Sequence, residues 1–179
     1  EFYSENNTTT SYVEIVDVKE ILNLNTLSPA SYSKDLIEVR KLLQAGTAMY
    51  IEDLTQLISG TTSISKEDIS NTYGIPYIKI ENLERDILDM FLSQKNVKEF
   101  VNSDFQRYHR HIITKDCLLL AKIGDRLKPT IFRPQNGFDK IILNPNVLAL
   151  YLEPNSRISL EFLYYQFYSD FLLNQIDQK

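Results

Sequence analysis

Apolar residues are spaced differently in the first quarter of the chain and in its middle. In residues 34–46, KDLIEVRKLLQAG, apolar positions recur three and four apart and stop at Gly46, which predicts a helix. Further along, short runs of β-branched or long apolar residues are bounded by Pro, Gly, Asn or Asp and predict strands. These runs are residues 76–80, 117–123, 130–134, 140–144 and 147–153.

Turn signals separate the predicted strands. Asn136-Gly137 lies between 130–134 and 140–144 and favours a hairpin there, and Asn144-Pro145-Asn146 predicts a turn before 147–153. Leu54, Leu57 and Ile58 indicate a short amphipathic segment, and we expect the polar loop 59–65 after it to separate helix from sheet. Residues 12–22 mix two periods, so they are either a strand or a docking segment.

A second helix is predicted near the end of the chain, where Ser159 can cap it. Its apolar positions fall three and four apart: Leu160, Leu163, Tyr164, Phe167, Tyr168, Phe171 and Leu172. The stripe either packs on the domain's own sheet or meets a partner helix. The expected fold class is α/β (α+β), with a mixed curved sheet, an N-terminal helix and a C-terminal amphipathic helix on the partner side. We expect residues 1–46 to form a connector with a helix and 47–179 to form a single domain.

Size and composition predict one folded domain. The chain has 179 residues, of which 43% are hydrophobic and 24% charged, and no apolar run approaches the roughly 18 residues that cross a bilayer. Residues 1–10 lack the basic start and apolar stretch of a signal peptide. The single cysteine, Cys117, lies in an apolar run and is expected to be a core thiol. These features predict a cytoplasmic protein.

Charge is distributed unevenly. The net charge is −5, yet residues 107–140 hold eight basic and three acidic residues, a net +5, so the rest of the chain carries −10. A basic segment on an acidic body can orient the protein on a polyanion. An ordinary solvated surface explains the same pattern.

The sequence offers little support for catalysis. It contains no phosphate-binding loop, no Gly-x-Ser-x-Gly elbow and no Cys-x-x-Cys pair. His109 and His111 lack a third ligand and are expected to contact solvent or phosphate. Residues 144–147, NPNV, lack the second proline and the aromatic of an adenine-methyltransferase loop, and Asp17-Val18-Lys19 lacks the Pro-Asp partner of a nuclease. We therefore expect no catalytic residues, no metal and no cofactor.

The order of four segments resembles the target recognition domain of restriction-modification specificity subunits. The segments are 74–83 (GIPYIKIENL), 117–129 (CLLLAKIGDRLKP), 143–154 (LNPNVLALYLEP) and 160–173 (LEFLYYQFYSDFLL), so the resemblance covers roughly residues 50–176. Residues 24–43 are similar to the connector found where such a domain is fused to an adenine methyltransferase. The chain departs from the family in holding one recognition domain and in lacking a second glycine after Gly124.

This resemblance implies a bacterial DNA-reading module that is not itself an enzyme. Its partners would be double-stranded DNA, a DNA methyltransferase subunit or domain that binds S-adenosylmethionine, and a restriction subunit in a full complex. The candidate DNA-binding residues are Lys79, Asn82, Lys122, Arg126, Lys128, Arg133, Gln135, Asn136 and Lys140. Among them Arg126, Arg133, Gln135 and Asn136 are the expected base contacts. Two alternatives stay open: a small metal-dependent DNA-processing enzyme, and a protein-interaction module without DNA binding, whose basic residues would be dispersed.

Overall fold

The computed structural model describes residues 41–42, 45–46, 49–60, 64–84, 86–102, 108, 111–124, 127–169 and 172. Its helices are α3 (Ile51–Leu54) and α4 (Leu160–Gln166), with 3-10 turns η2 (Lys66–Asp68), η3 (Ile80–Asn82) and η4 (Gln94–Asn96). Its strands are β1 (Thr55–Ser59), β2 (Ile69–Ser70), β3 (Ile75–Ile78), β4 (Phe100–Val101), β5 (Ile112–Ile113), β6 (Cys117–Ala121), β7 (Thr130–Phe132), β8 (Ile141–Leu143) and β9 (Val147–Leu152).

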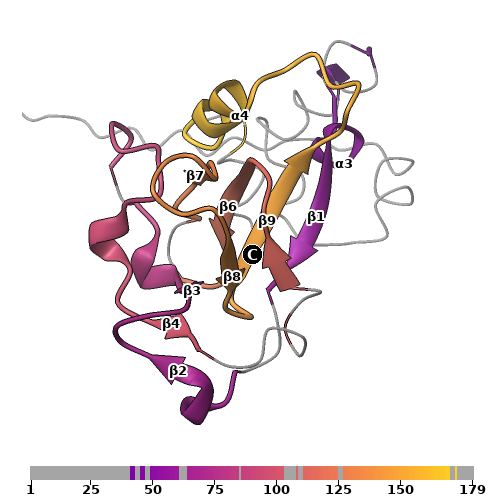
Figure 1. Cartoon of the computed structure of the whole chain (residues 1–179). Coiled ribbons are helices and arrows are strands. Elements are labelled where there is room, and N and C mark those ends of the chain that lie inside the picture. The colour runs from indigo at the N-terminus through magenta and orange to yellow at the C-terminus, as the bar shows by residue number, and fades with distance from the viewer. Residues whose placement is uncertain are drawn as a thin grey trace, which may run out of the picture.

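The strands form two sheets (Figure 1). The first sheet has the order β1-β9-β6-β7 and is antiparallel throughout. The second has the order β2-β4-β3-β8-β5 and is mixed, because β3 and β8 run parallel. The five runs expected to be strands became β3, β6, β7, β8 and β9, which confirms the mixed α and β class; the expected single sheet is instead two.

The main core lies between the two sheets. Alternate residues of β6, Cys117, Leu119 and Ala121, join a cluster that also contains Ile78 of β3 and Ile141 of β8. The intervening Leu118 and Leu120 point to the other face, where they contact a second cluster. Because both faces of β6 are covered, its sequence is a continuous apolar run instead of an alternation of apolar and polar residues.

Helix α4 covers the outer face of the first sheet (Figure 1). Ser159 caps the helix, since its Oγ accepts a hydrogen bond from the backbone N–H of Phe162 at 3.1 Å. Leu160, Leu163, Tyr164 and Phe167 are buried against the sheet, which confirms the cap and the packing on the domain's own sheet. Phe162 and Tyr165 point the other way and are about half exposed, at 52% and 49%.

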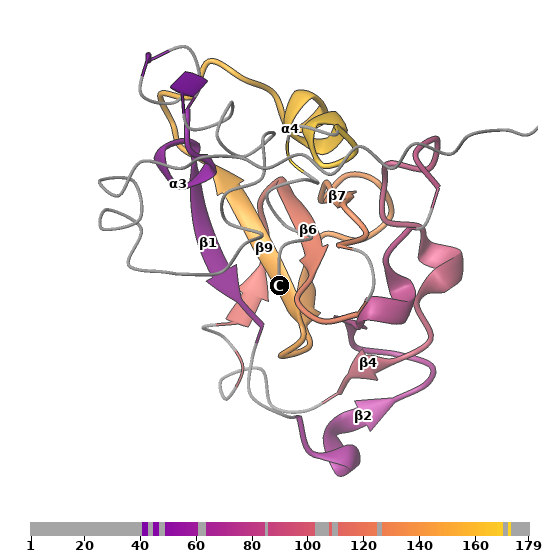
Figure 2. The ribbon, with the colours of Figure 1, turned by 180° about the vertical axis from the view of Figure 1, so that it is seen from behind.

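Two predictions about connections were wrong. The amphipathic segment after Leu54 is strand β1, at the edge of the first sheet in Figure 2, so the polar loop 59–65 does not separate helix from sheet. Backbone pairing with β9 fixes β1, and Leu57 and Ile58 both remain exposed, so no buried alternation marks it as a strand. Asn136-Gly137 also closes no hairpin: β7 pairs with β6, whereas β8 pairs with β3 and β5, in the other sheet.

Some predictions fall outside the described residues. These are the segment 12–22, the Asp17-Val18-Lys19 triplet and most of the helix predicted over 34–46. Where that helix was expected to end, the N–H of Ala45 donates to the carbonyl of Lys41 at 2.9 Å and Gly46 has φ +70°, as at a helix C-terminus. Within the described residues, no helix is long and apolar enough to span a membrane.

Candidate nucleic-acid interface

The described candidate residues divide between the two ends of β6. Lys122 directly follows Ala121, which pairs with Val147, whereas Arg133 directly follows Phe132, which pairs with Cys117. At about 3.4 Å per residue these ends are roughly 14 Å apart. Lys79, Lys122 and Lys128 belong to the first end, here called the Asn144 end. Arg133, Gln135, Asn136 and Lys140 belong to the second, here called the 133–140 loop. Asn82 lies between them, since it bonds Lys79 and also Asn96 of η4, the turn that contacts Gly137. Arg126 lies outside the described residues.

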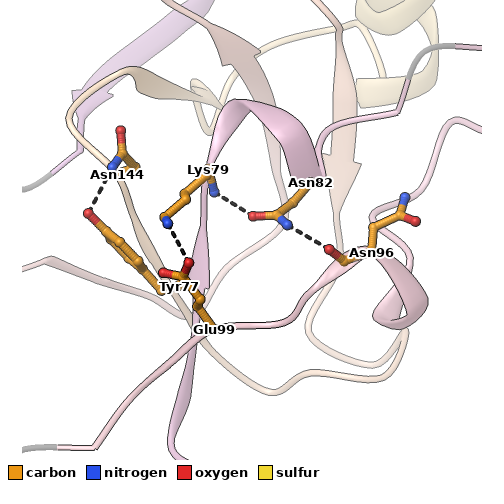
Figure 3. Close-up of polar contacts among 6 residues, drawn as sticks. All are labelled: Tyr77, Lys79, Asn82, Asn96, Glu99 and Asn144. Carbon is orange, nitrogen blue, oxygen red and sulfur yellow. Dashed lines mark hydrogen bonds and ion pairs between the residues drawn. The ribbon is translucent and has the colours of Figure 1, made fainter. Parts of the chain in front are cut away.

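Asn144 organises the first end (Figure 3). Its Nδ2 donates to the hydroxyl of Tyr77 at 2.8 Å, and its Oδ1 accepts from the backbone N–H of Asn146 at 3.0 Å. Its own N–H donates to the carbonyl of Ile78 at 2.8 Å, which joins the β8–β9 turn to the end of β3. Asn144 is therefore a turn residue between two strands, as the sequence indicated.

Lys79 and Asn82 have partners inside the protein (Figure 3). The Lys79 ammonium pairs with the Glu99 carboxylate and lies 5.8 Å from the centre of the Tyr77 ring. Asn82 is only 5% exposed, and its side chain accepts from the N–H of Lys79 at 2.7 Å and donates to the carbonyl of Asn96 at 2.6 Å. Asn82 thus holds η3 against η4, and its buried amide presents no edge to a base.

The two other lysines of the Asn144 end differ in exposure. Lys122 is exposed just after β6, and its backbone N–H donates to the carbonyl of Asn146 at 2.8 Å. Lys128 is half-buried, and its Nζ donates to the carbonyl of Ile80 at 3.3 Å. Of the described lysines predicted at this end, Lys122 is the one most open to a phosphate.

The 133–140 loop begins with a tight turn. The N–H of Asn136 donates to the carbonyl of Arg133 at 2.9 Å, and Pro134 occupies the second position, where its fixed φ suits a β-turn. Gly137 follows with φ +110°, a conformation that strains other residues. Gln94 holds the loop from outside, because its Nε2 donates to the carbonyl of Gly137 at 2.6 Å.

Arg133 anchors the start of this loop. Its Nε donates to Asp116 and its Nη2 to Glu161 of α4, each at 2.8 Å, and the guanidinium lies 5.5 Å from the centre of the Phe91 ring. The hydrogen bond to Glu161, followed by that to Asp116, raises the pKa of Arg133. The guanidinium therefore ties β7 to the β5–β6 connection and to α4, and two of its five N–H donors are bonded to carboxylates.

Gln135, Asn136 and Lys140 are exposed on this loop. Within the described residues, the side chains of Gln135 and Asn136 make no hydrogen bond. Two exposed lysines lie beside the loop: Lys95 follows Gln94, and Lys115 follows β5, whose Ile113 pairs with Ile141 next to Lys140. Sequence reasoning missed Gln94 and Lys95, since only the contact with Gly137, 43 residues away, brings them to the loop.

The described residues show neither a cluster of metal ligands nor an accessible thiolate. Among the residues described, no three His, Cys, Asp or Glu side chains are grouped as metal ligands. His109 is outside those residues, and His111 is partly exposed. Cys117 is fully buried, and burial raises the pKa of its thiol, as expected of a core cysteine.

Solved structures with a similar fold include two chains from restriction-modification systems. One comes from a study of complex assembly and conformational transition in a type I restriction-modification system, with a TM-score of 0.50 and 11% identity over 88% of this chain and 38% of that one. The other is the HsdS subunit from Thermoanaerobacter tengcongensis, with a TM-score of 0.50 and 10% identity over 90% of this chain and 39% of that one. No protein-family model and no curated protein sequence matches the chain.

This chain thus spans about two fifths of the length of the chains that it matches. At this identity the likeness is one of fold. It confirms, at that level, the resemblance to restriction-modification specificity subunits that the four sequence segments carry.

Proposed function

We propose that this chain is a sequence-specific DNA-binding module of a bacterial restriction-modification system, without catalytic activity, which directs a methyltransferase and an endonuclease to their site. The observation that carries the proposal is the fold, which is shared over 88% and 90% of the chain with a type I restriction-modification chain and with an HsdS subunit. The exposed amides of the 133–140 loop, with Lys140 in the loop and Lys95 and Lys115 beside it, add groups suited to bases and phosphates.

In this proposal the chain contributes binding and orientation, while chemistry belongs to its partners. S-adenosylmethionine would be held by the methyltransferase, which would flip and methylate an adenine. The outward side of α4, with Phe162 and Tyr165 about half exposed, is the side that we assign to a partner subunit, because aromatic residues are enriched at protein interfaces. The described basic residues of 107–140 divide between the two ends of β6, and the proposal places the DNA at one of them, the 133–140 loop.

The test is binding to a random-sequence duplex library, followed by sequencing of the bound fraction. We expect binding to weaken steeply between about 50 and 200 mM salt, because lysine–phosphate contacts release counterions, and a sequence to be enriched. Failure to bind any duplex at the low-salt end would refute the proposal. Salt-sensitive binding without enrichment would leave a DNA-binding protein but refute sequence reading.

A protein-interaction module is the second candidate. The exposed Phe162 and Tyr165 favour it, and so does the division of the described basic residues between the two ends of β6. It predicts that the library is not bound and that substituting both aromatics with serine abolishes binding to the partner subunit. The DNA-reading proposal predicts that the same two substitutions leave DNA affinity unchanged, since Phe162 and Tyr165 are on the outward side of α4 and Glu161, which holds Arg133, is kept.

A further inference from the structure

Amide side chains at the two ends of β6 differ in what they already bind. Asn82 is buried with both its oxygen and nitrogen bonded, and Asn144 bonds Tyr77 and the N–H of Asn146. The Asn144 end thus offers one exposed amide, that of Asn146. On the 133–140 loop, Gln135 and Asn136 are both exposed, and their side chains have no hydrogen-bond partner among the described residues. The second end therefore presents two adjacent amides that can pair with a base without losing an internal contact.

The turn that carries these amides is held on both sides. Arg133 is fixed by Asp116 and Glu161, and Gly137 is fixed by Gln94. Phe138, just beyond, packs against the core cluster between the sheets. A turn fixed in this way loses little conformational freedom on binding, which favours affinity and a defined geometry.

A lysine is adjacent in sequence to each of two residues that anchor the turn, Gln94 and Asp116. Lys95 is next to Gln94, and Lys115 is next to Asp116, the partner of Arg133. Both are exposed, and side-chain ammonium groups at these positions can contact phosphates on either side of a groove. The major groove is about 12 Å wide, which admits a short turn.

We infer that the turn Arg133–Asn136 is the base-reading element and that it reads an adenine, with which the amide of either Gln135 or Asn136 forms two hydrogen bonds. An Asn or Gln amide matches adenine in the major groove, since its oxygen accepts from N6 and its nitrogen donates to N7. Arg133, the residue here that would suit guanine, is held by two carboxylates. The inference rests on the proposed function, to which it adds the element and the base.

The experiment uses the duplex enriched by the wild-type chain, in which each adenine is replaced in turn by 7-deazaadenine. This analogue lacks the N7 acceptor but keeps the Watson–Crick pair. We expect one adenine position at which the replacement weakens wild-type binding by about 2- to 13-fold, the range for losing one of the two hydrogen bonds of a bidentate contact. The double variant Gln135→Ala/Asn136→Ala loses the whole contact, so it should bind the unmodified duplex about 5- to 150-fold more weakly and be insensitive to the replacement.

A matched control removes two exposed amides elsewhere. Gln56→Ala/Asn146→Ala changes β1 and the Asn144 end, and it should keep both the affinity and the sensitivity to 7-deazaadenine. The inference is overturned if the Gln135/Asn136 variant keeps the sensitivity, or if no adenine position is sensitive in the wild type. In those outcomes sequence-selective binding persists and the proposed function stands, whereas a chain that binds no duplex refutes both.

Discussion

Gly137→Ala tests whether Gln94 holds the 133–140 loop. Gly137 has φ +110°, and an added Cβ would meet the Nε2 of Gln94 at 1.9 Å. Because Nε2 is the far end of a flexible side chain, Gln94 can move away, but it then loses its 2.6 Å hydrogen bond to the Gly137 carbonyl. The substitution therefore combines backbone strain with the loss of a tertiary contact.

Gly124→Ala is the matched control for the strain. Gly124 has φ +105° and nothing within 4 Å of an added Cβ, so its substitution carries strain without a clash. Strain of this kind costs about 1–3 kcal/mol, and loss of the Gln94 hydrogen bond adds about 0.5–1.5 kcal/mol. Gly137→Ala should therefore be more destabilising than Gly124→Ala by about 1 kcal/mol.

Urea unfolding gives both costs as free energies of unfolding, and a double-mutant cycle isolates the contact. In a Gln94→Ala background, which lacks the clash and the hydrogen bond, Gly137→Ala should cost no more than Gly124→Ala. Equal costs for the two glycine substitutions in the wild type, together with additivity of Gln94→Ala and Gly137→Ala, would refute the assignment of Gln94 as an anchor.

Three further predictions concern stability and reactivity. Asn144→Ala should lower the free energy of unfolding by about 1–3 kcal/mol, because the Tyr77 hydroxyl loses its partner. Substitution of the exposed Asn146 with alanine should change the free energy of unfolding by less than about 0.5 kcal/mol. Similar urea midpoints for the two variants would contradict the role of Asn144. Burial raises the pKa of Tyr151 from 10.0 to about 12, so this tyrosine contributes stability that is present below pH 10 and lost as pH rises toward 12. In urea titrations, the Tyr151→Phe variant should therefore lose less stability than the wild type between those pH values. An equal loss in the two proteins would contradict the raised pKa of Tyr151. Cys117 is fully buried, and burial raises the pKa of its thiol. Iodoacetamide should therefore label it only at urea concentrations that unfold the chain. Rapid labelling without urea would show that the thiol is accessible.

Strands were predictable from sequence where burial on both faces produced apolar runs. Residues 117–121 and 147–152 are examples, since their side chains contact one cluster or the other on alternate faces. β1 gave no such signal, because its pairing with β9 places exposed Leu57 and Ile58 at a sheet edge. The connection at Asn136-Gly137 was misread because a turn signal is local, whereas the choice of pairing partners for β7 and β8 depends on tertiary packing.

The candidate site was predictable only in part, for a related reason. In the sequence, Asn82 and Asn136 are equivalent polar residues after apolar runs, but burial gives the first a structural role and leaves the second exposed. Arg133 finds its carboxylate partners 17 and 28 residues away, a pairing that no local pattern indicates. The sequence composition identified the basic region 107–140. The strand register, which composition does not give, shows that its described residues lie at the two opposite ends of β6.

The central claim, that DNA binds at the 133–140 loop, is tested most directly by comparing two pairs of lysines in salt-dependent DNA binding. Lys140 ends the loop and Lys115 lies beside it. Lys66 precedes β2, at the opposite edge of the second sheet from β5, and Lys122 lies at the opposite end of β6. Substituting Lys115 and Lys140 with alanine should weaken binding and reduce the slope of log affinity against log salt by about one per lysine–phosphate contact. The same change at Lys66 and Lys122 should leave both unchanged, although Lys122 is the candidate at the Asn144 end most open to a phosphate. The reverse pattern would place the DNA at the Asn144 end and contradict the account.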